Sequence, residues 1–428
     1  MTERLYYNDS FLKEFDATVV SCAEEGEPSN AGKRVAEGRP SFAEKPGTEG
    51  RRWRVALDRT AFYPTSGGQP HDTGTLGDAR VVEVLGDEAS DDGKDDVIHF
   101  TDRVLAPGPV HGKIDWERRF DHMQQHTGQH LLSAAFIELF QMPTVSFHLG
   151  REISTIDIAA ATVGSKHMED AERRTNEIIF DDRAVNVLYG TAGELAAAGV
   201  RKQVEREGVL RAIEIEGFDR QPCGGTHVAR TGQIGMILLR RVEKVKQNWR
   251  VEFVCGWRAL RAARADAASL GEAARLLGCA PGEAPGMVAR ALEERQAGYR
   301  ARQRLTEELA EVQALMLVAT ERRAGKAGGP GVVIRVLDEP DASYARMLAT
   351  KVVEQGSTRA LIATRGGHLI FAQSAGLDAD MNALLKECVS PAGGKGGGSR
   401  DFAQGSVSDA RRVEEVLASA AEKLGAGK

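Results

Sequence analysis

Cysteine is scarce in this 428-residue chain, which has five, at positions 22, 223, 255, 279 and 388. Their number is odd and none forms a Cys-X-X-Cys pair, which argues against a disulfide framework and favours a reducing cytoplasm. No run approaches the roughly 18 apolar residues that a membrane span requires. Residues 1–10 lack the apolar stretch of a secretory signal. These absences predict a cytoplasmic protein with no membrane partner.

The sequence also lacks an excess of positive charge. Its formal net charge is −6, from 56 Lys and Arg against 62 Asp and Glu, which argues against a protein that simply coats nucleic acid. A nucleic-acid partner is still compatible with this charge, because local basic patches can lie within an acidic chain. The length is too great for one ordinary core and predicts two to four domains.

Changes in sequence pattern divide the chain into four expected parts. Residues 1–115 contain short strands separated by turns, typical of a small N-terminal β-barrel. Residues 116–256 mix helical and strand patterns and are expected to form an α+β core. Residues 257–326 are expected to be a helical arm, and residues 327–428 alternate strand and helix as in a small α/β domain. The predicted fold class is therefore α+β multidomain.

Within the barrel region, the expected strands are Trp53–Leu57, Ala79–Leu85 and Val97–Phe100, preceded by a long exposed loop at 23–52. The core region is expected to contain strands at Thr155–Ala159, Gln233–Arg240 and Arg250–Val254 and a helix at about 165–180. Together they predict an α+β unit.

A long helix is expected to open the core region. Asp121 is a suitable N-cap residue, and Gln124 three positions later completes a capping-box pattern. Leu131 and Leu139 follow at helical spacing, and Pro143 marks the expected end.

The arm carries an apolar seam. Leu305, Leu309, Val312 and Met316 recur at spacings of four, three and four, which is typical of a helical hairpin or a short coiled coil. Such an arm could set the distance between two functional regions or support a homodimer, as could the C-terminal domain.

Two histidines on the expected helix are candidate metal ligands. His126 and His130 lie four residues apart, so their side chains share one face. Such pairs are often only surface residues. A zinc protease would have Glu directly after the first histidine, and Thr127 stands there instead.

A second candidate pair follows about a hundred residues later. Cys223 and His227 are again four apart, and Gly224 and Gly225 between them allow a tight turn. With His126 and His130 they predict a tetrahedral site for one zinc ion per chain. The sequence leaves open whether that zinc is structural or catalytic.

Three motifs, in order along the chain, resemble those of the alanyl-tRNA synthetase editing domain. They are the Gly-rich segment 62–74, the helix 126–135 with both histidines, and the Cys-Gly-Gly-Thr-His segment 223–227. Residues 393–405 are similar to the glycine-rich signature of the small domain that ends alanyl-tRNA synthetase and accompanies DHH phosphoesterases. No stretch that could hold an ATP-dependent aminoacylation domain precedes the barrel. The resemblance is therefore to the freestanding alanyl-tRNA editing proteins, in their long form.

The resemblance implies a hydrolase that removes serine or glycine from mischarged alanine tRNA, with zinc held by His126, His130, Cys223 and His227. We take Cys223, His126 and His130 as the catalytic residues. Zinc could acidify a bound water or orient the aminoacyl end.

The Gly-rich segment supplies hydroxyl and amide groups that could distinguish serine from alanine. Thr65 and Gln69 are the candidates, with His148 as a third substrate-binding residue. Alternatively, these residues only form a turn or lie on the surface.

Near the C-terminus, Lys395 and Arg400 are the candidate RNA-binding residues. They flank glycines 396–398, whose backbone amides could follow a phosphate backbone. The alternative is a flexible linker.

Three rival functions stay open. The chain could be a non-catalytic tRNA-binding protein with a structural zinc, or a deacylase for another tRNA, since threonyl-tRNA synthetase editing domains share a similar motif layout. A DHH phosphoesterase is disfavoured, because the nearest match, Asp121-His122-Met123, lacks the second histidine.

Overall fold

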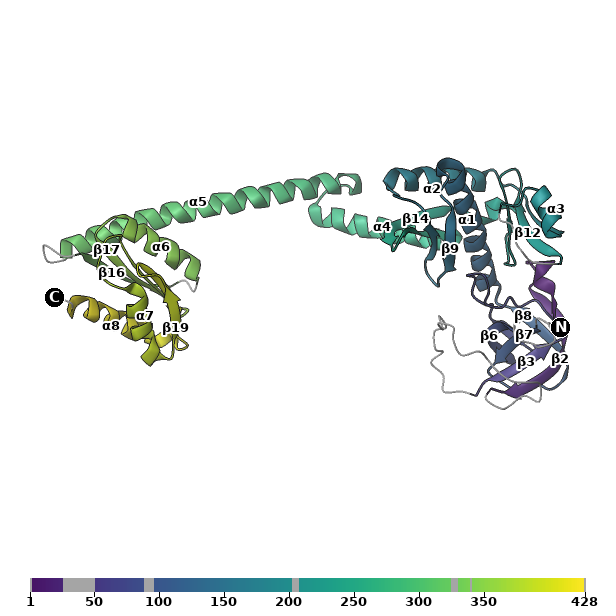
Figure 1. Ribbon diagram of the computed structural model, residues 1–428, viewed down its shortest axis with the longest axis horizontal. Coiled ribbons are helices and arrows are strands. Elements are labelled where there is room, and N and C mark those ends of the chain that lie inside the picture. The colour runs from purple at the N-terminus through teal and green to yellow at the C-terminus, as the bar shows by residue number, and fades with distance from the viewer. Residues whose placement is uncertain are drawn as a thin grey trace. The chain divides into compact units, whose positions relative to one another are not determined.

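The computed structural model describes residues 2–25, 51–87, 96–201, 208–324, 330–338 and 341–426 (Figure 1). The chain divides into two compact units, Met1–Leu270 and Gly271–Lys428. None of the described helices is long and apolar enough to cross a membrane, and all five cysteines are free. Most of the loop expected at 23–52 lies outside the described residues.

A closed barrel begins the first unit, as expected. Its hydrogen-bonded order is β2 (Glu14–Glu24), β3 (Trp53–Leu57), β7 (Asp96–Thr101), β6 (Ala79–Asp87), β5 (Gly74–Leu76) and β8 (Gly108–Ile114). Alternate residues of β2, namely Phe15, Ala17 and Val19, point inward and are buried, which is the side-chain period of a strand. Beside the barrel, η1 (Leu5–Tyr7) follows β1 (Glu3–Arg4), which pairs in parallel with β4 (Arg59–Thr60).

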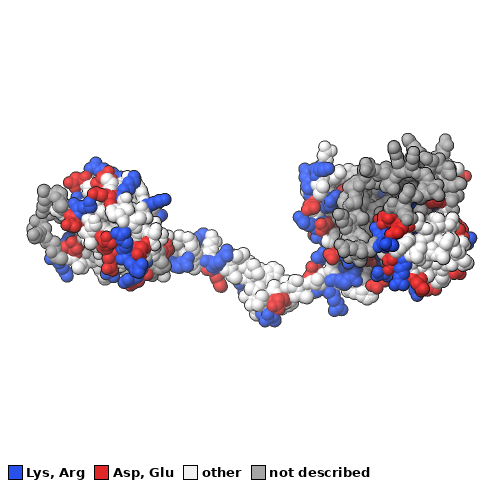
Figure 2. Space-filling view, turned by 90° about the horizontal axis from the view of Figure 1, so that it is seen from below, with Lys and Arg blue, Asp and Glu red and all other residues white. Residues whose placement is uncertain are grey.

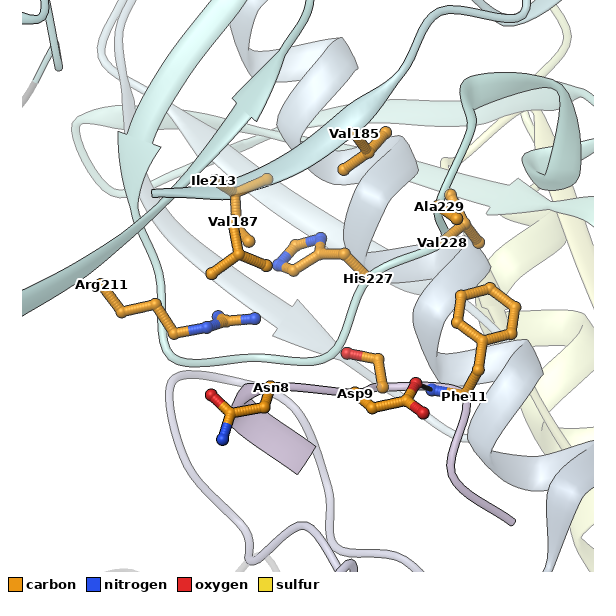
Figure 3. A pocket seen from close by; sticks show the side chains of 11 residues that line it. Asn8, Asp9, Phe11, Val185, Val187, Arg211, Ile213, His227, Val228 and Ala229 are labelled. Atoms are coloured by element: carbon orange, nitrogen blue, oxygen red, sulfur yellow. Dashed lines mark hydrogen bonds between the residues drawn. The ribbon is translucent and has the colours of Figure 1, made fainter. Parts of the chain in front are cut away.

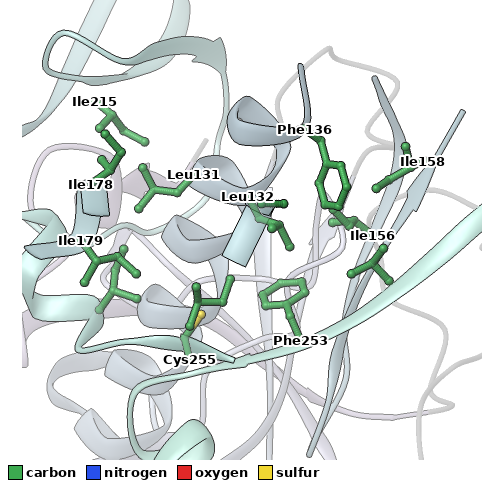
Figure 4. Close-up of a cluster of buried hydrophobic side chains, with 14 of the residues drawn as sticks. Leu131, Leu132, Phe136, Ile156, Ile158, Ile178, Ile179, Ile215, Phe253 and Cys255 are labelled. Atoms are coloured by element: carbon green, nitrogen blue, oxygen red, sulfur yellow. The ribbon is translucent and has the colours of Figure 1, made fainter. Parts of the chain in front are cut away.

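The rest of the first unit is built on a four-stranded antiparallel sheet. Its order is β14 (Ile237–Val245), β15 (Asn248–Cys255), β10 (Ser154–Ile158) and β9 (Thr144–Leu149). Two helices, α1 (Trp116–Phe140) and α2 (Ser165–Phe180), pack with this sheet around one core. Figure 4 shows Leu132 and Phe136 of α1 near Phe253 and Ile156 of the sheet, and Leu131 next to Ile178 of α2, all fully buried.

Helix α1 begins earlier than predicted. Its N-cap is Asp115, whose carboxylate accepts a hydrogen bond from the backbone N–H of Arg118 at 3.3 Å. Asp121 lies inside the helix, where its carboxylate pairs with Arg258. The prediction of Asp121 as the N-cap was wrong because Trp116 and Phe120, ahead of and beside it, already pack on the core. The predicted end before Pro143 is confirmed.

A smaller antiparallel sheet leads into the Cys-Gly-Gly-Thr-His segment. It consists of β11 (Val185–Gly190), β12 (Leu210–Ile215) and β13 (Asp219–Pro222), with α3 (Ala192–Ala197) after β11 and η2 (Thr231–Ile234) after the segment itself. Because β13 ends at Pro222, Cys223 is held at the end of a strand.

Helices fill the region expected to be helical. They are α4 (Gly256–Leu277) and α5 (Ala284–Ala324), and the interruption between them contains η3 (Pro281–Glu283). The four residues of the predicted seam, 305, 309, 312 and 316, are 48–64% exposed. Helix α5 instead buries Ala314 and Val318 against α6 and the sheet of the second unit.

The second unit is a five-stranded sheet between two helical layers. Its order is β16 (Gly331–Leu337), β17 (Thr358–Thr364), β18 (His368–Gln373), β20 (Phe402–Ser406) and β19 (Lys395–Gly398), and only β16 and β17 run parallel. Helices α5 and α6 (Ala342–Glu354) cover one face, and α7 (Met381–Val389) and α8 (Val413–Ala426) share a core with the other. Two short turns, η4 (Ser390–Ala392) and η5 (Ala410–Arg412), complete it.

The glycines at 396–398, expected as a loop, form part of strand β19 instead. A Cβ on Gly398 would lie 2.2 Å from the carbonyl oxygen of Phe402, and one on Gly396 would lie 2.8 Å from that of Gln404. Glycine is therefore required here for close approach to β20. Since β19 pairs with β20 alone, it forms an edge of the sheet.

Candidate metal centre

Helix α1 places the first two candidate ligands side by side. His126 and His130 are 3% and 2% exposed, and their ring centroids are 5.1 Å apart. The spacing of four residues therefore produces the shared face that the sequence predicted, with that face turned into the protein.

The segment after β13 brings the other two. The Sγ atom of Cys223 lies 3.4 Å from Nε2 of His126 and 3.3 Å from Nε2 of His227. Donor atoms of His126, His130, Cys223 and His227 all lie within 4.8 Å of one another. Segments about a hundred residues apart thus converge on four donors that could hold a metal ion.

One glycine of this segment is required by the approach of the helix. A Cβ on Gly225 would lie 2.2 Å from Cε1 and 2.5 Å from Nδ1 of His126. Gly224 faces no such contact, because its nearest neighbour would be Oη of Tyr7 at 3.6 Å.

The donor spacing fits zinc. A tetrahedral ion with bonds of about 2.0–2.1 Å to nitrogen and 2.3 Å to sulfur has ligand atoms roughly 3.3–3.6 Å apart. The two sulfur–nitrogen distances of 3.4 and 3.3 Å are of this size. Three imidazoles and a thiolate are also a usual set of zinc ligands.

Hydrogen bonds from neighbouring side chains orient two of the rings. Nδ1 of His126 lies 2.7 Å from Oε1 of Gln69, whose Nε2 donates to Oγ1 of Thr226 at 2.9 Å. Nδ1 of His227 lies 3.1 Å from Oγ1 of Thr127. A ring that donates from Nδ1 keeps its Nε2 lone pair for a metal.

Burial sets the protonation state of the ligands. It lowers the pKa of His126 to about 3, with the nearby guanidinium of Arg211 as a second cause. It also holds the pKa values of His130 and His227 well below their usual range and raises the pKa of the Cys223 thiol. The imidazoles are therefore in the neutral form that binds metals, whereas the thiol must lose a proton when a metal binds.

The predicted substrate-binding residues lie in different surroundings. Gln69 is fully buried and contacts the candidate ligand His126. Thr65 is exposed, with Oγ1 3.0 Å from Nδ1 of His71. His148 is exposed on β9, opposite Thr155. Gln69 is therefore hydrogen-bonded to a candidate metal ligand.

A buried ion pair fastens the Gly-rich segment to α1. Arg119 and Asp72 form it with both side chains 0% exposed. Arg119 also donates to the carbonyl oxygens of Ser10 and Ala61. One side chain therefore ties the N-terminal segment and the Gly-rich segment to the helix that carries the histidines.

Several residues of the centre were not predicted from the sequence. Phe147 stacks on His126 with ring centroids 5.3 Å apart, Oγ1 of Thr127 lies 3.1 Å from Nδ1 of His227, and Thr226 accepts from Gln69. Arg211 was also missed. The two threonines stand within the His126–His130 and Cys223–His227 motifs, which could have drawn attention to them, but no local pattern marks Phe147 or Arg211.

The two candidate RNA-binding residues lie in the second unit. Lys395 begins β19 and is exposed, and so is Arg400, whose Nη2 donates to the carbonyl oxygen of Asp378 at 3.0 Å. In the view of Figure 2, basic and acidic side chains are intermixed over this unit rather than separated.

A cavity adjoins the metal centre (Figure 3). It has a volume of about 150 Å³ and is lined by residues of the N-terminal segment, of strands β11 and β12 and of the segment 227–229. His227 is one wall, so the cavity reaches the ligand group itself.

Comparisons with known proteins point in one direction. A family model described as the threonyl and alanyl tRNA synthetase second additional domain matches residues 210–252, which include six of the cavity and candidate ligand residues: 211, 213, 223, 227, 228 and 229. The chain is 31% identical over 436 residues to the alanyl-tRNA editing protein AlaX-L of Pyrococcus horikoshii, covering 99% of this chain and 98% of that protein.

Two further relatives are matched over only about half of their own length. The alanine–tRNA ligase of Thermococcus kodakarensis is 29% identical over 99% of this chain and 44% of the ligase. An alanyl-tRNA editing protein of Bos taurus is 37% identical over 59% of this chain and 54% of that protein. The Pyrococcus horikoshii protein is thus matched nearly from end to end.

Proposed function

The chain belongs to the alanyl-tRNA editing proteins of the AlaX-L type, and we propose that it hydrolyses the ester of alanine tRNA that carries serine or glycine by mistake. The observation that carries this proposal is the buried group of three imidazoles and one thiol, part of which lies in the segment matched by the synthetase family model. As a step of translation, this reaction would take place in the cytoplasm.

The reaction adds the oxygen of water to the carbonyl carbon of the aminoacyl ester. The bond between that carbon and the ribose oxygen breaks, the amino acid leaves with the water oxygen, and a proton from the water passes to the ribose oxygen, which becomes a hydroxyl. Negative charge develops on the carbonyl oxygen before the bond breaks, so the site must present groups that stabilise it.

We propose one zinc ion per chain, held by His126, His130, Cys223 and His227. When bound, zinc would supply Lewis-acid chemistry, which polarises a carbonyl or lowers the pKa of water. The residues of the chain contribute orientation: Gln69 fixes the ring of His126, and the burial of the histidines keeps them neutral. We propose Cys223, His126 and His130 as the catalytic residues because they would hold this zinc ion.

Selection of serine over alanine is proposed to involve Thr65, Gln69 and His148. A hydrogen bond to the serine hydroxyl would favour serine, because the alanine ester leaves a polar group of the site unpaired. Thr65 is exposed and its hydroxyl is near His71. Thr65→Val should therefore slow release of serine more than release of alanine, and a change in neither rate would remove Thr65 from the site.

Contact with the tRNA body is proposed for the C-terminal part, through Lys395 and Arg400 at and beside the exposed edge strand β19. We keep the division 1–115, 116–256, 257–326 and 327–428 as a proposal, and with it a homodimer through the helical arm or the C-terminal domain. Deletion from residue 327 onward should weaken tRNA binding, and unchanged affinity would argue against an RNA-binding role.

A deacylase for another tRNA is the second candidate, because the matched family model covers threonyl as well as alanyl synthetases. The deciding experiment measures release of amino acid from seryl-, glycyl- and alanyl-tRNA for alanine, and from seryl-tRNA for threonine. Rapid release of serine or glycine from alanine tRNA, with slow release of alanine, is the expected result. Release from threonine tRNA alone would favour the second candidate.

Cys223→Ala tests the role of the metal in the same assay. We expect this variant to lose both zinc and activity, while Cys279→Ala, a change outside the ligand group, should keep both. If Cys223→Ala retained its zinc and its deacylase activity, the assignment of the centre would be wrong. Absence of release from any tRNA by zinc-loaded protein would leave a non-catalytic tRNA-binding protein.

A further inference from the structure

The cavity beside His227 is formed by three separate parts of the first unit. Strands β11 and β12 contribute Val185, Val187, Arg211 and Ile213, and residues 8–11 face them. Figure 3 shows the Arg211 side chain reaching from β12 toward the space between His227 and Asn8. Three of these four strand residues are apolar, and Arg211 supplies the positive charge on that side of the cavity.

Arg211 is held in place by one of its terminal nitrogens. Nη1 donates to the carbonyl oxygen of Cys223 at 2.7 Å and to that of Gly225 at 3.0 Å. The guanidinium carbon lies 5.5 Å from the ring centroid of Tyr7, within the range of a cation–π contact. The side chain is therefore positioned by the same segment that carries the ligand Cys223.

The remaining nitrogens of Arg211 have no partner within the described part of the chain. Nε and Nη2 are buried and make no hydrogen bond there, and none of the ion pairs among described residues includes Arg211. Buried donors of a charged group that are left unpaired carry the full cost of their removal from water. Such an arrangement is typical of a group whose partner is a ligand.

Arg211 also lies close to the candidate metal centre. It donates to the carbonyl oxygens of Cys223 and Gly225 and lines the same cavity as His227. An oxygen bound by its free nitrogens would lie near the place where the ester reacts.

We propose that Arg211 binds a negatively charged oxygen of the aminoacylated tRNA end in this cavity, an inference that rests on the proposed function. The planar guanidinium fork suits both oxyanions and phosphates. About 150 Å³ gives room for several waters, and so for a phosphate group or the carbonyl end of a small aminoacyl ester. The oxygen is either the oxyanion formed on the ester carbonyl or one of the terminal phosphodiester.

Kinetics of Arg211→Met and Arg211→Lys separate the two sources. If the oxygen is the reacting oxyanion, Arg211→Met should lower kcat for deacylation about 100- to 1,000-fold with little change in KM. If it belongs to the phosphodiester, KM should rise while kcat changes little. Arg211→Lys keeps the charge without the fork and should lie between wild type and Arg211→Met in either case.

Two controls separate substrate binding from support of the metal site. Arg220→Met changes an arginine of the adjacent strand β13 whose partners are Glu214 and the carbonyl of Ala198, and it should keep wild-type kinetics. Zinc content is measured for every variant, since loss of the bonds to Cys223 and Gly225 could release the ion. Guanidinium ion added to a smaller variant, Arg211→Ala, should restore part of its activity.

Three results would overturn the inference. They are kcat and KM of Arg211→Met within twofold of wild type at full zinc occupancy, a loss fully reversed by added zinc, and an Arg220→Met defect as large as that of Arg211→Met. A wild-type protein inactive on every tRNA would instead defeat the proposed function. Calorimetric titration with inorganic phosphate then tests Arg211 alone: binding by wild type but not by Arg211→Met supports it, and equal binding or none overturns it.

Discussion

Replacing Gln69 by Leu should weaken zinc binding about 10- to 100-fold. Gln69 accepts from Nδ1 of His126 at 2.7 Å and donates to Thr226 at 2.9 Å, at a site with 0% exposure. Leucine of similar size removes both contacts. Loss of such supporting hydrogen bonds typically costs 10- to 100-fold in metal affinity.

The magnitude follows from the position of His126. Its ring is 3% exposed, so an Nδ1–H without an acceptor is unpaired in a nearly dry site and costs about 1–3 kcal/mol. A metal-free ring can turn to relieve part of this cost, whereas a metal-bound ring cannot. The cost therefore falls mainly on the metal-bound state, and it corresponds to roughly 5- to 150-fold in affinity.

Competition between the protein and a chelator of known zinc affinity measures the effect. Gln69→Glu is the matched control, because a carboxylate of the same length can still accept from His126 and should preserve more of the affinity than leucine does. A zinc dissociation constant for Gln69→Leu within twofold of wild type would refute the positioning role. An equal loss in both variants would assign the effect to the bond with Thr226 instead.

Three further changes test other parts of the first unit. Gly225→Ala should lower the zinc retained after dialysis, because its Cβ would come within 2.2 Å of a ring carbon of His126. Gly224→Ala should not, because the nearest atom to its Cβ would be 3.6 Å away. Equal zinc contents of the two variants would contradict this prediction. Arg119→Met leaves Asp72 buried without its cation, since both side chains are 0% exposed, and should lower the free energy of unfolding in urea by about 3–5 kcal/mol; a loss below about 1 kcal/mol would contradict it. Burial lowers the pKa of His99 in the barrel core to about 4. The unfolded chain takes up this proton near pH 6.5 and the folded chain does not, so stability should fall by up to about 3 kcal/mol from pH 6.5 to 4. His99→Gln should show a shallower pH dependence of unfolding than wild type, and identical slopes would count against the shift.

The ligand group could be predicted because its signals are local. A spacing of four on a helix puts His126 and His130 on one face regardless of the rest of the fold. The glycines between Cys223 and His227 likewise indicate a tight turn. The pattern could not predict the contact of Gln69 with His126, because 57 positions separate the two residues. The Gly-rich motif that contains Gln69 is also explained by a simple turn.

The start of α1 shows the same limit. Asp115 and Asp121 both satisfy the local rule for an N-cap. The structure selects Asp115, whose backbone N–H donates to the carbonyl of Thr73, with Trp116 and Phe120 packed on the core. Those contacts come from residues distant in sequence. Strand β19 was missed for a related reason, because its glycines are explained only by the closeness of β20 and α7.

The barrel region contributes to the candidate metal centre through the segment between β4 and β5. Between β4 and β5, the segment 61–73 leaves the barrel, and its Gln69 reaches His126 while its Asp72 is bound by Arg119, seven residues before His126 on the same helix. His126 is therefore fixed twice, once by α1 and once through the barrel segment. Ligands and catalytic groups have to be held within about 0.5 Å of their working geometry. Two independent attachments to one ring meet that requirement better than the helix alone, which explains why the Gly-rich segment and the histidine motif occur together in this chain.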